Sequence, residues 1–220
     1  MRRTGVRFTT PVRHADAPEV ELIDNWDVLG MRATVSWTVR VKNLRLPAEA
    51  IIGEPGYWVR DDPRTFSLGF ASNHLGEAEG ILEFCLDWVR ARPHLQNSDL
   101  MLYRFGDFGA RLFGVRAAME AAAREWELGE DFDRAELLSL HVLHLAKKAV
   151  LEISQVAFDI CGARAIFKQY PLEQAYRDAR SFTLHTRDDH LTCTVGKGLL
   201  YGDFSGKGYI DGATVPRVGK

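Results

Sequence analysis

Apolar residues alternate with polar ones in an early stretch of the chain. In TVSWTVRVKNL, residues 34–44, every second side chain from Val35 to Val41 is apolar, a period of two that is typical of a half-buried β-strand. The apolar positions are Val35, Trp37, Val39 and Val41. Shorter strands are predicted over residues 6–11 and 20–23. Three strands are few for an independent sheet, so this region is expected to be part of a larger β structure.

From Asp62 onward the apolar residues recur every three or four positions, which indicates amphipathic helices. A first helix is predicted to begin at Asp62, a good N-cap residue followed by a proline. It should stop at Pro93, because proline cannot continue a helix. A second helix is predicted from about Ser98 to Leu128, with Gly129 behind it as a stop.

A third helix is predicted to begin at Asp133, which forms a capping-box-like pair with Glu136. It should end at Gly162, which can take the left-handed position after a helix. A fourth helix is predicted from Pro171 to about His185, and a shorter one over residues 190–201. The fold class is therefore mainly α: long helices with short connections favour an antiparallel bundle, here preceded by a partial β-barrel segment.

These periods divide the chain into three expected parts. Residues 1–58 form the β segment, residues 59–202 the helical bundle, and residues 203–220 a glycine-rich tail that is loose or draped on a neighbour.

Composition and charge argue against several classes of protein, among them nucleic-acid-binding and membrane-spanning proteins. The 220 residues are 46% hydrophobic and 26% charged, with a formal net charge of −2, so no electrostatic footprint for nucleic acid is present. No apolar stretch is long enough to span a bilayer, and the N-terminus lacks the apolar core of a secretory signal. Three cysteines without CxxC spacing read as reduced packing thiols, neither a disulfide framework nor a metal site. A cytoplasmic protein is expected.

Three segments carry motifs, and in this order they resemble the C-terminal half of acyl-CoA dehydrogenase superfamily flavoproteins. NWDVLGMRATVSWTVRVKNLRLPAEAIIG, residues 25–53, resembles the end of the family's middle β-domain, with its LGMR motif. LDWVRARP, residues 86–93, resembles the end of the first bundle helix. DICGARAIFKQYPLEQAYRDARSFTLH, residues 159–185, resembles the family's G-G-x-x-(Y/F)…PLER-x-x-RD-x-R segment. The resemblance implies the bundle fold and a flavin cofactor, FAD or FMN.

The resemblance begins inside the β-domain, so the chain is expected to be a fragment or a subunit. It departs from the dehydrogenases at the catalytic base. The family's proton-abstracting glutamate falls on about Thr186, and a second base position used by some members falls near Leu68; neither residue is a carboxylate. RDARSFTLH, residues 177–185, is instead most similar to the monooxygenase-like branch, which includes dibenzothiophene and related sulfur-acquisition monooxygenases.

That branch implies that His185 faces the flavin, where an imidazole could donate a hydrogen bond or act as general acid or base. The alternative for His185 is a helix-end histidine that offsets unpaired carbonyls. Arg92 matches an arginine that contacts flavin phosphate, commonly across a subunit interface, and a planar guanidinium suits phosphate. The alternative for Arg92 is a helix-end cation.

Four further residues are cofactor candidates. Gly162 and Ala163 match a pair that allows the backbone to approach the cofactor, although a plain helix stop explains Gly162 equally well. Arg177 and Arg180 either shape the flavin site or a subunit contact, or form local ion pairs such as Arg177 with Glu173.

His74 is the candidate substrate contact, because it shares an apolar stripe with Arg92; a core histidine is the alternative. No group of residues has the spacing of a metal site.

Two functions from different classes follow. The first is a flavin-dependent oxidoreductase. It either dehydrogenates an acyl thioester or oxygenates a small aromatic or heteroatom-containing substrate, and the missing glutamate favours oxygenation. The second is a non-catalytic helical partner of a full-length flavoprotein. Either is expected to form a homo-oligomer, or a hetero-oligomer with a chain that supplies the N-terminal half.

Overall fold

The computed structural model of the protein describes residues 17–45, 47–50, 66–186 and 188–202. The chain divides into two compact units, which are described separately. Unit 1 comprises residues 1–28 and 32–63, and unit 2 comprises residues 29–31 and 64–220. The predicted boundary between residues 58 and 59 and the predicted strand over residues 6–11 lie outside the described residues. Within the described ranges, no helix is both long and apolar enough to cross a membrane.

Unit 1 contains an antiparallel pair of strands. The strand β1 (Val20–Ile23) pairs with β2 (Thr38–Val41), with Val20 opposite Val41. The predicted strand over residues 20–23 is confirmed. Two single-turn 3₁₀ helices flank β2: η1 (Arg32–Thr34) and η2 (Ala48–Ala50).

The long strand predicted over residues 34–44 is shorter in the structure. Val35 has a φ of +46°, an unfavourable angle for a β-branched residue, which breaks the extended backbone before β2 begins. The predicted half-burial is wrong for β2, because all four of its residues are exposed, Val39 and Val41 by about half. Its apolar side chains therefore have no covering layer among the described residues.

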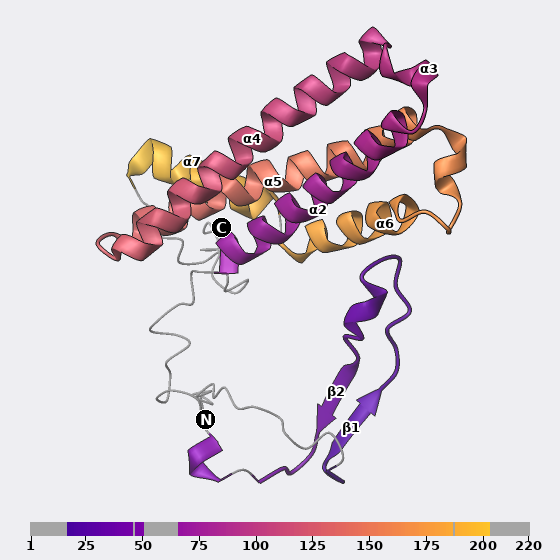
Figure 1. The fold of residues 1–220 in the computed structure, drawn as a ribbon. Helices are drawn as coiled ribbons and strands as arrows, with labels where there is room; N and C mark the ends of the chain where they lie inside the picture. The colour runs from indigo at the N-terminus through magenta and orange to yellow at the C-terminus, as the bar shows by residue number, and fades with distance from the viewer. Residues whose placement is uncertain (1–16, 46, 51–65, 187, 203–220) are drawn as a thin grey trace, which may run out of the picture. The chain divides into compact units, whose positions relative to one another are not determined.

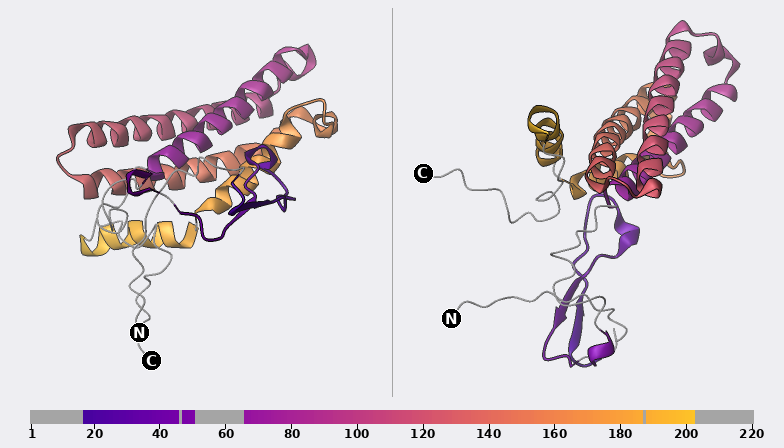
Figure 2. Two further views of the ribbon diagram at one scale, coloured as in Figure 1. Left: turned by 90° about the horizontal axis from the view of Figure 1, so that it is seen from below. Right: turned by 90° about the vertical axis from the view of Figure 1, so that its left-hand side faces the viewer.

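Unit 2 is the predicted helical bundle (Figure 1). Its long helices are α2 (Phe66–Arg90), α4 (Asp99–Leu128) and α5 (Phe132–Cys161). The shorter elements are α3 (Pro93–Gln96), η3 (Ala163–Ile166), α6 (Leu172–Phe182), η4 (Thr183–His185) and α7 (Asp188–Tyr201). Consecutive long helices run antiparallel, as the views in Figure 2 also show.

Because α4 lies between them in the chain, α2 and α5 run parallel. Two contacts mark the ends of this pair: the Ser67 hydroxyl donates to the Glu136 carboxylate at one end, 2.8 Å, and the Cys85 and Cys161 sulfur atoms lie 3.7 Å apart at the other. Glu136 is fully buried, so the predicted capping box of Asp133 and Glu136 is wrong. The Glu136 side chain reaches across to Ser67 of α2 instead.

Helix ends follow local chemistry. The N-cap of α5 is Asp131, whose carboxylate accepts a 2.9 Å hydrogen bond from the Arg134 amide. Gly129 ends α4 in the left-handed region, as predicted. Pro93 does not end α2 directly; the helix stops at Arg90, and Pro93 occupies the first turn of α3, where its missing N–H costs nothing.

The core of unit 2 lies between α2, α4 and α5, where the three helices bury apolar residues such as Ala78, Leu112 and Ile153. The α6 helix packs Leu172 and Ala179 against this core. It ends at Phe182, three residues before the predicted end, and the chain tightens into η4. In a 3₁₀ turn residues three apart share a face, so His185 follows Phe182.

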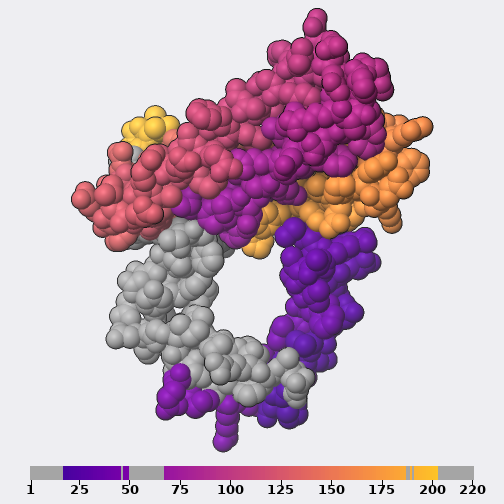
Figure 3. All heavy atoms as spheres, in the orientation of Figure 1, coloured from indigo at the N-terminus to yellow at the C-terminus, as the bar shows by residue number. Residues whose placement is uncertain are grey.

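The outer face of α4 is apolar and uncovered. Leu102, Tyr103 and Phe113 are 60%, 73% and 75% exposed, and three helical glycines lie among them: Gly106, Gly109 and Gly114. In the space-filling view α4 lies beside α2 along one face of unit 2 (Figure 3).

Candidate functional site

A cluster of four rings brings the first half of α2 to the end of α6. Phe182 lies 4.7 Å from His74 between ring centroids and 5.7 Å from Phe70. The His185 ring is 4.9 Å from Phe70 and 6.0 Å from Phe182. The structure therefore brings both predicted site histidines to the ring of Phe182. His74 is fully buried and His185 is exposed.

His74 is held in its neutral form. Burial and the nearby positive charge of Lys147 lower the pKa of His74 from 6.5 to about 4. Its Nδ1 atom is buried and has no hydrogen-bond partner. A buried polar atom without a partner is rare in folded proteins. His74 can therefore offer one ring nitrogen to a bound molecule.

Lys147 links this cluster to Thr186, the residue that the sequence resemblance matches to the family's base. The side chain is buried on α5, and its Nζ donates to the Thr186 carbonyl oxygen, 2.9 Å, and to the Thr186 Oγ1, 3.2 Å. The residue at the base position is thus bonded to a cation rather than ionised itself. Sequence reasoning missed Lys147, because its apolar neighbours on α5 gave it no distinguishing signal.

Glu77 is a second residue that sequence reasoning missed. It lies on α2 one turn after His74 and is half-buried. Burial, and then the negative charge of Asp178 on α6, raise the pKa of Glu77 to about 7. A carboxyl group that titrates near neutrality beside a ring cluster is a functional-site candidate on physical grounds.

Arg92 lies in a separate cluster at the other end of α2. Its guanidinium stacks over the Trp88 ring at 3.6 Å and donates a 2.7 Å hydrogen bond to the Trp88 carbonyl oxygen. Tyr170 packs edge-on against the same Trp88 ring, 5.0 Å between centroids. Among the described residues no carboxylate pairs with Arg92. The stacking orients a cation whose remaining N–H groups are available for an anion.

Gly162 lies close to this cluster, because it follows Cys161, whose pKa responds to the charge of Arg92. Gly162 has φ +75° and ψ −178°, a region that only glycine adopts readily, so it is not the left-handed C′ geometry that was predicted. A Cβ at Gly162 would meet no atom within 4 Å. The backbone angles therefore explain why a glycine stands at position 162. Ala163 begins η3 directly after it.

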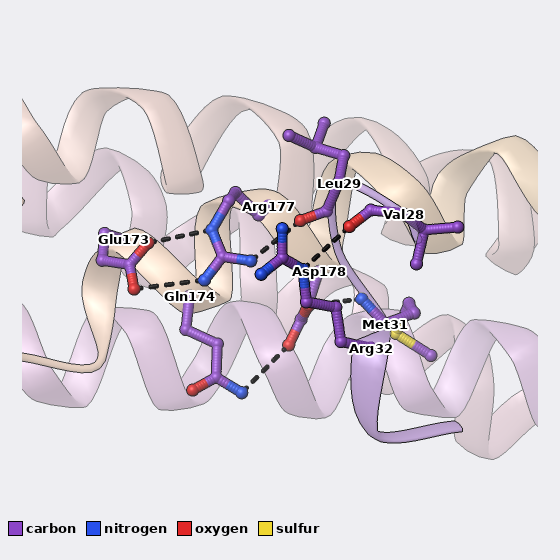
Figure 4. A network of polar contacts seen from close by, with 8 residues as sticks. All are labelled: Val28, Leu29, Met31, Arg32, Glu173, Gln174, Arg177 and Asp178. Carbon is purple, nitrogen blue, oxygen red and sulfur yellow. Dashed lines mark hydrogen bonds and ion pairs between the residues drawn. The ribbon is translucent and has the colours of Figure 1, made fainter. Parts of the chain in front are cut away.

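Arg177 and Asp178 hold the segment Leu29–Met31 against α6 (Figure 4). Arg177 binds both Glu173 oxygens, at 2.9 and 3.1 Å, and donates a 2.8 Å hydrogen bond to the Leu29 carbonyl oxygen. The Asp178 carboxylate accepts a 2.5 Å hydrogen bond from the Met31 amide. These contacts favour a positioning role for Arg177.

Gly30 is required in the middle of this segment. A Cβ there would overlap the Arg177 carbonyl group and come within 2.7 Å of the Ser181 hydroxyl oxygen. The LGMR motif therefore has a local physical reason: its glycine lets the backbone lie directly on α6.

Arg180 lies in a groove that it shares with Lys147 and Thr186. The groove is open, has a volume of about 420 Å³ and is also lined by Thr183 and Asp189. The Arg180 guanidinium donates a long 3.4 Å hydrogen bond to the Thr183 hydroxyl, which itself donates to the Arg180 carbonyl oxygen, 3.0 Å. Within the described residues Arg180 contributes to neither the ring cluster nor the Arg92 cluster.

The two clusters are far apart. From His74 to the end of α2 at Arg90 the helix rises about 24 Å, at 1.5 Å per residue. The candidates therefore separate into the ring cluster with His74 and His185, and the Arg92 cluster with Gly162.

Comparisons with known proteins agree with this architecture. The profile of the family described as "Acyl-CoA dehydrogenase, C-terminal domain" matches residues 68–189, more than half of the chain. Dibenzothiophene monooxygenase from Rhodococcus erythropolis is 28% identical over 213 residues, covering 84% of this chain and 51% of that protein. Bovine mitochondrial short-chain specific acyl-CoA dehydrogenase is 25% identical over 190 residues, covering 83% and 45%.

A solved structure is similar at the same level. The complex of dibenzothiophene monooxygenase TdsC from Paenibacillus sp. A11-2 with FMN and indole has a TM-score of 0.76 and 25% identity, covering 84% of this chain and 54% of that one. The chain spans about half the length of the relatives it matches. By its sequence profile and its helical bundle, this chain belongs to the acyl-CoA dehydrogenase family, of which it carries the C-terminal domain.

Proposed function

We propose that this chain supplies the C-terminal side of the flavin site of an FMN-dependent monooxygenase that acts on a small aromatic or sulfur-containing substrate. The base position carries this proposal. Where a dehydrogenase needs a carboxylate, this chain has Thr186 bonded to buried Lys147, with His185 next to it in the ring cluster. Two of the similar proteins are named as dibenzothiophene monooxygenases, and one of them is solved with FMN.

The residues present fit a flavin. The ring cluster offers an apolar aromatic wall, Phe70 and Phe182, and one buried polar atom without a partner, His74 Nδ1. A planar heteroaromatic ring with hydrogen-bonding edges is complementary to such a surface. When bound, reduced FMN supplies the electrons that activate molecular oxygen.

The charges near the ring cluster favour oxygen chemistry over proton abstraction. Burial, and then the charge of Lys147, keep His74 neutral, and Lys147 also places a positive charge beside Thr186. A fixed cation in a buried site stabilises negative charge that develops on a reacting oxygen. With no carboxylate at Thr186 or Leu68, the chain has no group at either family position to remove the α-proton of an acyl thioester.

His185 is the proposed catalytic residue. Its ring is exposed on one side and packs against Phe70 and Phe182, which fix its position. There it holds a proton and donates a hydrogen bond at the reacting oxygen. His74, whose ring also packs against Phe182, is the proposed substrate contact.

Arg92 is proposed to bind the flavin phosphate of a second chain. A five-carbon ribityl chain with its phosphate reaches roughly 10 Å at about 1.5 Å per covalent bond. This is less than half of the separation between the two clusters along α2. The ribityl phosphate alone does not span that separation, so we assign Arg92 to the FMN of a neighbouring chain in an oligomer.

The experiment adds reduced FMN and an aromatic sulfide to the full chain and measures oxygenated product and hydrogen peroxide. His185→Ala should keep the fold and the bound FMN but lower product formation by roughly 10²–10⁴, the contribution of a positioned acid or base. Peroxide release should increase. His94→Ala, an exposed histidine on α3, is the matched control and should change neither.

Two outcomes would contradict the proposal. Anaerobic reduction of a dye by the wild-type protein with an acyl-CoA would show a dehydrogenase. Failure to take up flavin, alone or with any co-purified chain, would favour the non-catalytic partner.

A further inference from the structure

Two buried cysteines meet where α2 and α5 end. Cys85 is fully buried on α2, and Cys161, the last residue of α5, is 7% exposed. Their sulfur atoms are 3.7 Å apart, within hydrogen-bonding distance. A disulfide bond is about 2.05 Å long, so the two atoms would need to approach by less than ~2 Å. The two helices pack together along this end, which keeps the thiols facing each other.

We propose that Cys85 and Cys161 form an oxidation site, a dithiol that hydrogen peroxide converts into an intramolecular disulfide between α2 and α5. This inference does not depend on flavin binding. It differs from the prediction of packing thiols, because packing alone does not explain why both sulfur atoms face each other across two helices.

The chemistry needs one peroxide and two thiols. The thiolate of Cys161 attacks one peroxide oxygen; an S–O bond forms, the O–O bond breaks, and the hydroxide that leaves takes a proton to become water. The sulfur of Cys85 then attacks the resulting sulfenic acid; the S–S bond forms and a second water leaves with the thiol proton. Two thiols lose two electrons, and one peroxide is reduced to two waters.

Cys161 is assigned as the attacking sulfur for two reasons. Its pKa is lowered by the hydrogen bond with Cys85 and by the positive charge of Arg92, in opposition to burial, whereas the same bond and burial raise the pKa of Cys85. Cys161 is also the more accessible of the two. The thiolate is the reactive form, so Cys161 reacts first and Cys85 resolves the sulfenic acid.

The disulfide would join the helix that leads to Arg92 to the residue before Gly162. Oxidation would therefore fix the spacing within the Arg92 cluster.

The remaining cysteine is a built-in control. Cys193 lies on α7 and is exposed. If exposure alone decided reactivity, Cys193 would be oxidised first and the buried pair would remain reduced. If the paired geometry decides, Cys85 and Cys161 are lost together while Cys193 forms only its own adducts.

The test treats the folded full-length protein with increasing hydrogen peroxide, blocks free thiols by alkylation, digests the protein and maps the cysteines by mass spectrometry. The expected product is a linked pair of peptides containing Cys85 and Cys161 that dithiothreitol separates. Cys193→Ser should leave this product unchanged. Cys85→Ala should instead accumulate a sulfenic acid on Cys161, trapped by dimedone, and Cys161→Ala should leave Cys85 as a free thiol.

Several results would overturn the inference. One is recovery of both buried cysteines as thiols at a peroxide concentration that fully oxidises Cys193. Another is a linked peptide that forms only after urea unfolds the chain. Trapping of the sulfenic acid on Cys85 instead would reverse the assigned order. Because the mapping of the wild-type protein needs no substitution, the test remains decisive if either alanine variant fails to fold.

Discussion

At the scale of single residues, neighbours across the fold decide what each titratable group does. Glu136 has the sequence position of a helix cap but is buried and accepts a hydrogen bond from Ser67. Glu77 looks like an ordinary carboxylate on an amphipathic helix, yet burial and Asp178 raise its pKa to about 7. Burial, and then the charge of Lys147, lower the pKa of His74 and so favour its neutral form.

The raised pKa of Glu77 predicts a pH dependence of stability. Its usual pKa is 4.5, so between pH 4.5 and 7 the folded chain binds the Glu77 proton more tightly than the unfolded chain. The free energy of unfolding should therefore fall as the pH rises through this window. Glu77→Gln, which stays neutral, should lose this component of the slope. Urea unfolding at pH 5, 6 and 7 measures it.

Glu83→Gln, an exposed carboxylate on the same helix, is the control for the loss of a charge. His74 titrates in an overlapping window with the opposite sign, because its lowered pKa adds stability that is lost as the pH falls below 6.5. Its effect is common to all three proteins and cancels in their differences. Parallel pH profiles for wild type and Glu77→Gln would refute the assignment.

At the scale of elements, the segment Leu29–Met31 is fixed by α6 rather than by a strand. Met31 has a φ of +56°, which is unfavourable for a residue with a side chain. The charge-assisted hydrogen bond from its amide to Asp178 offsets that strain. Arg177 holds the carbonyl oxygen of Leu29 at the same time. The adjacent R and D of the family motif thus bind the backbone of its LGMR motif.

Two glycine substitutions distinguish this contact from a general intolerance of side chains. Gly30→Ala should destabilise the protein by about 1–3 kcal/mol, because the new methyl group overlaps the α6 backbone. Gly114→Ala, on the open face of α4, should instead stabilise it by about 0.5–1 kcal/mol through helix propensity. Chemical denaturation measures both changes.

Hydrogen exchange at the Met31 amide gives a local readout for the same pair. Gly30→Ala should speed exchange at this amide, which is bonded to Asp178 in the wild type, and Gly114→Ala should not. Equal stability and equal exchange in Gly30→Ala and wild type would show that the segment is not docked on α6.

At the scale of the whole molecule, two surfaces point to association with another chain. The outer face of α4 exposes Leu102, Tyr103 and Phe113, and β2 exposes the apolar residues Val39 and Val41. Contiguous exposed apolar residues of this kind mark interaction surfaces. The proposed binding of the FMN phosphate by Arg92 of a second chain would give association a functional reason.

A mixing experiment tests whether Arg92 serves another chain. His185→Ala and Arg92→Ala should each abolish or strongly reduce oxygenation alone. If sites form between chains, a hybrid dimer of the two variants contains one intact site, so random mixing should restore about a quarter of wild-type activity. Recovery that disappears when the chains are kept apart by dilution supports this arrangement. No recovery in a proven hybrid would place both residues on one flavin or remove Arg92 from the site.

The sequence alone determined the elements and the family. Helical spacing predicted the long helices and the stop at Gly129, because the period of apolar residues and the chemistry of a helix end are local properties of the chain. The missing carboxylates at Leu68 and Thr186 could likewise be read from the motifs.

Only the tertiary structure decided which residues act together. Periodicity shows which face of a helix is buried but not which neighbour covers it. For that reason the pairing of His74 with Phe182, the bond from Lys147 to Thr186 and the approach of Cys85 to Cys161 were not predicted. Each depends on how α2, α5 and α6 pack side by side. The length of α2 also separates the Arg92 cluster from His74, by about 24 Å.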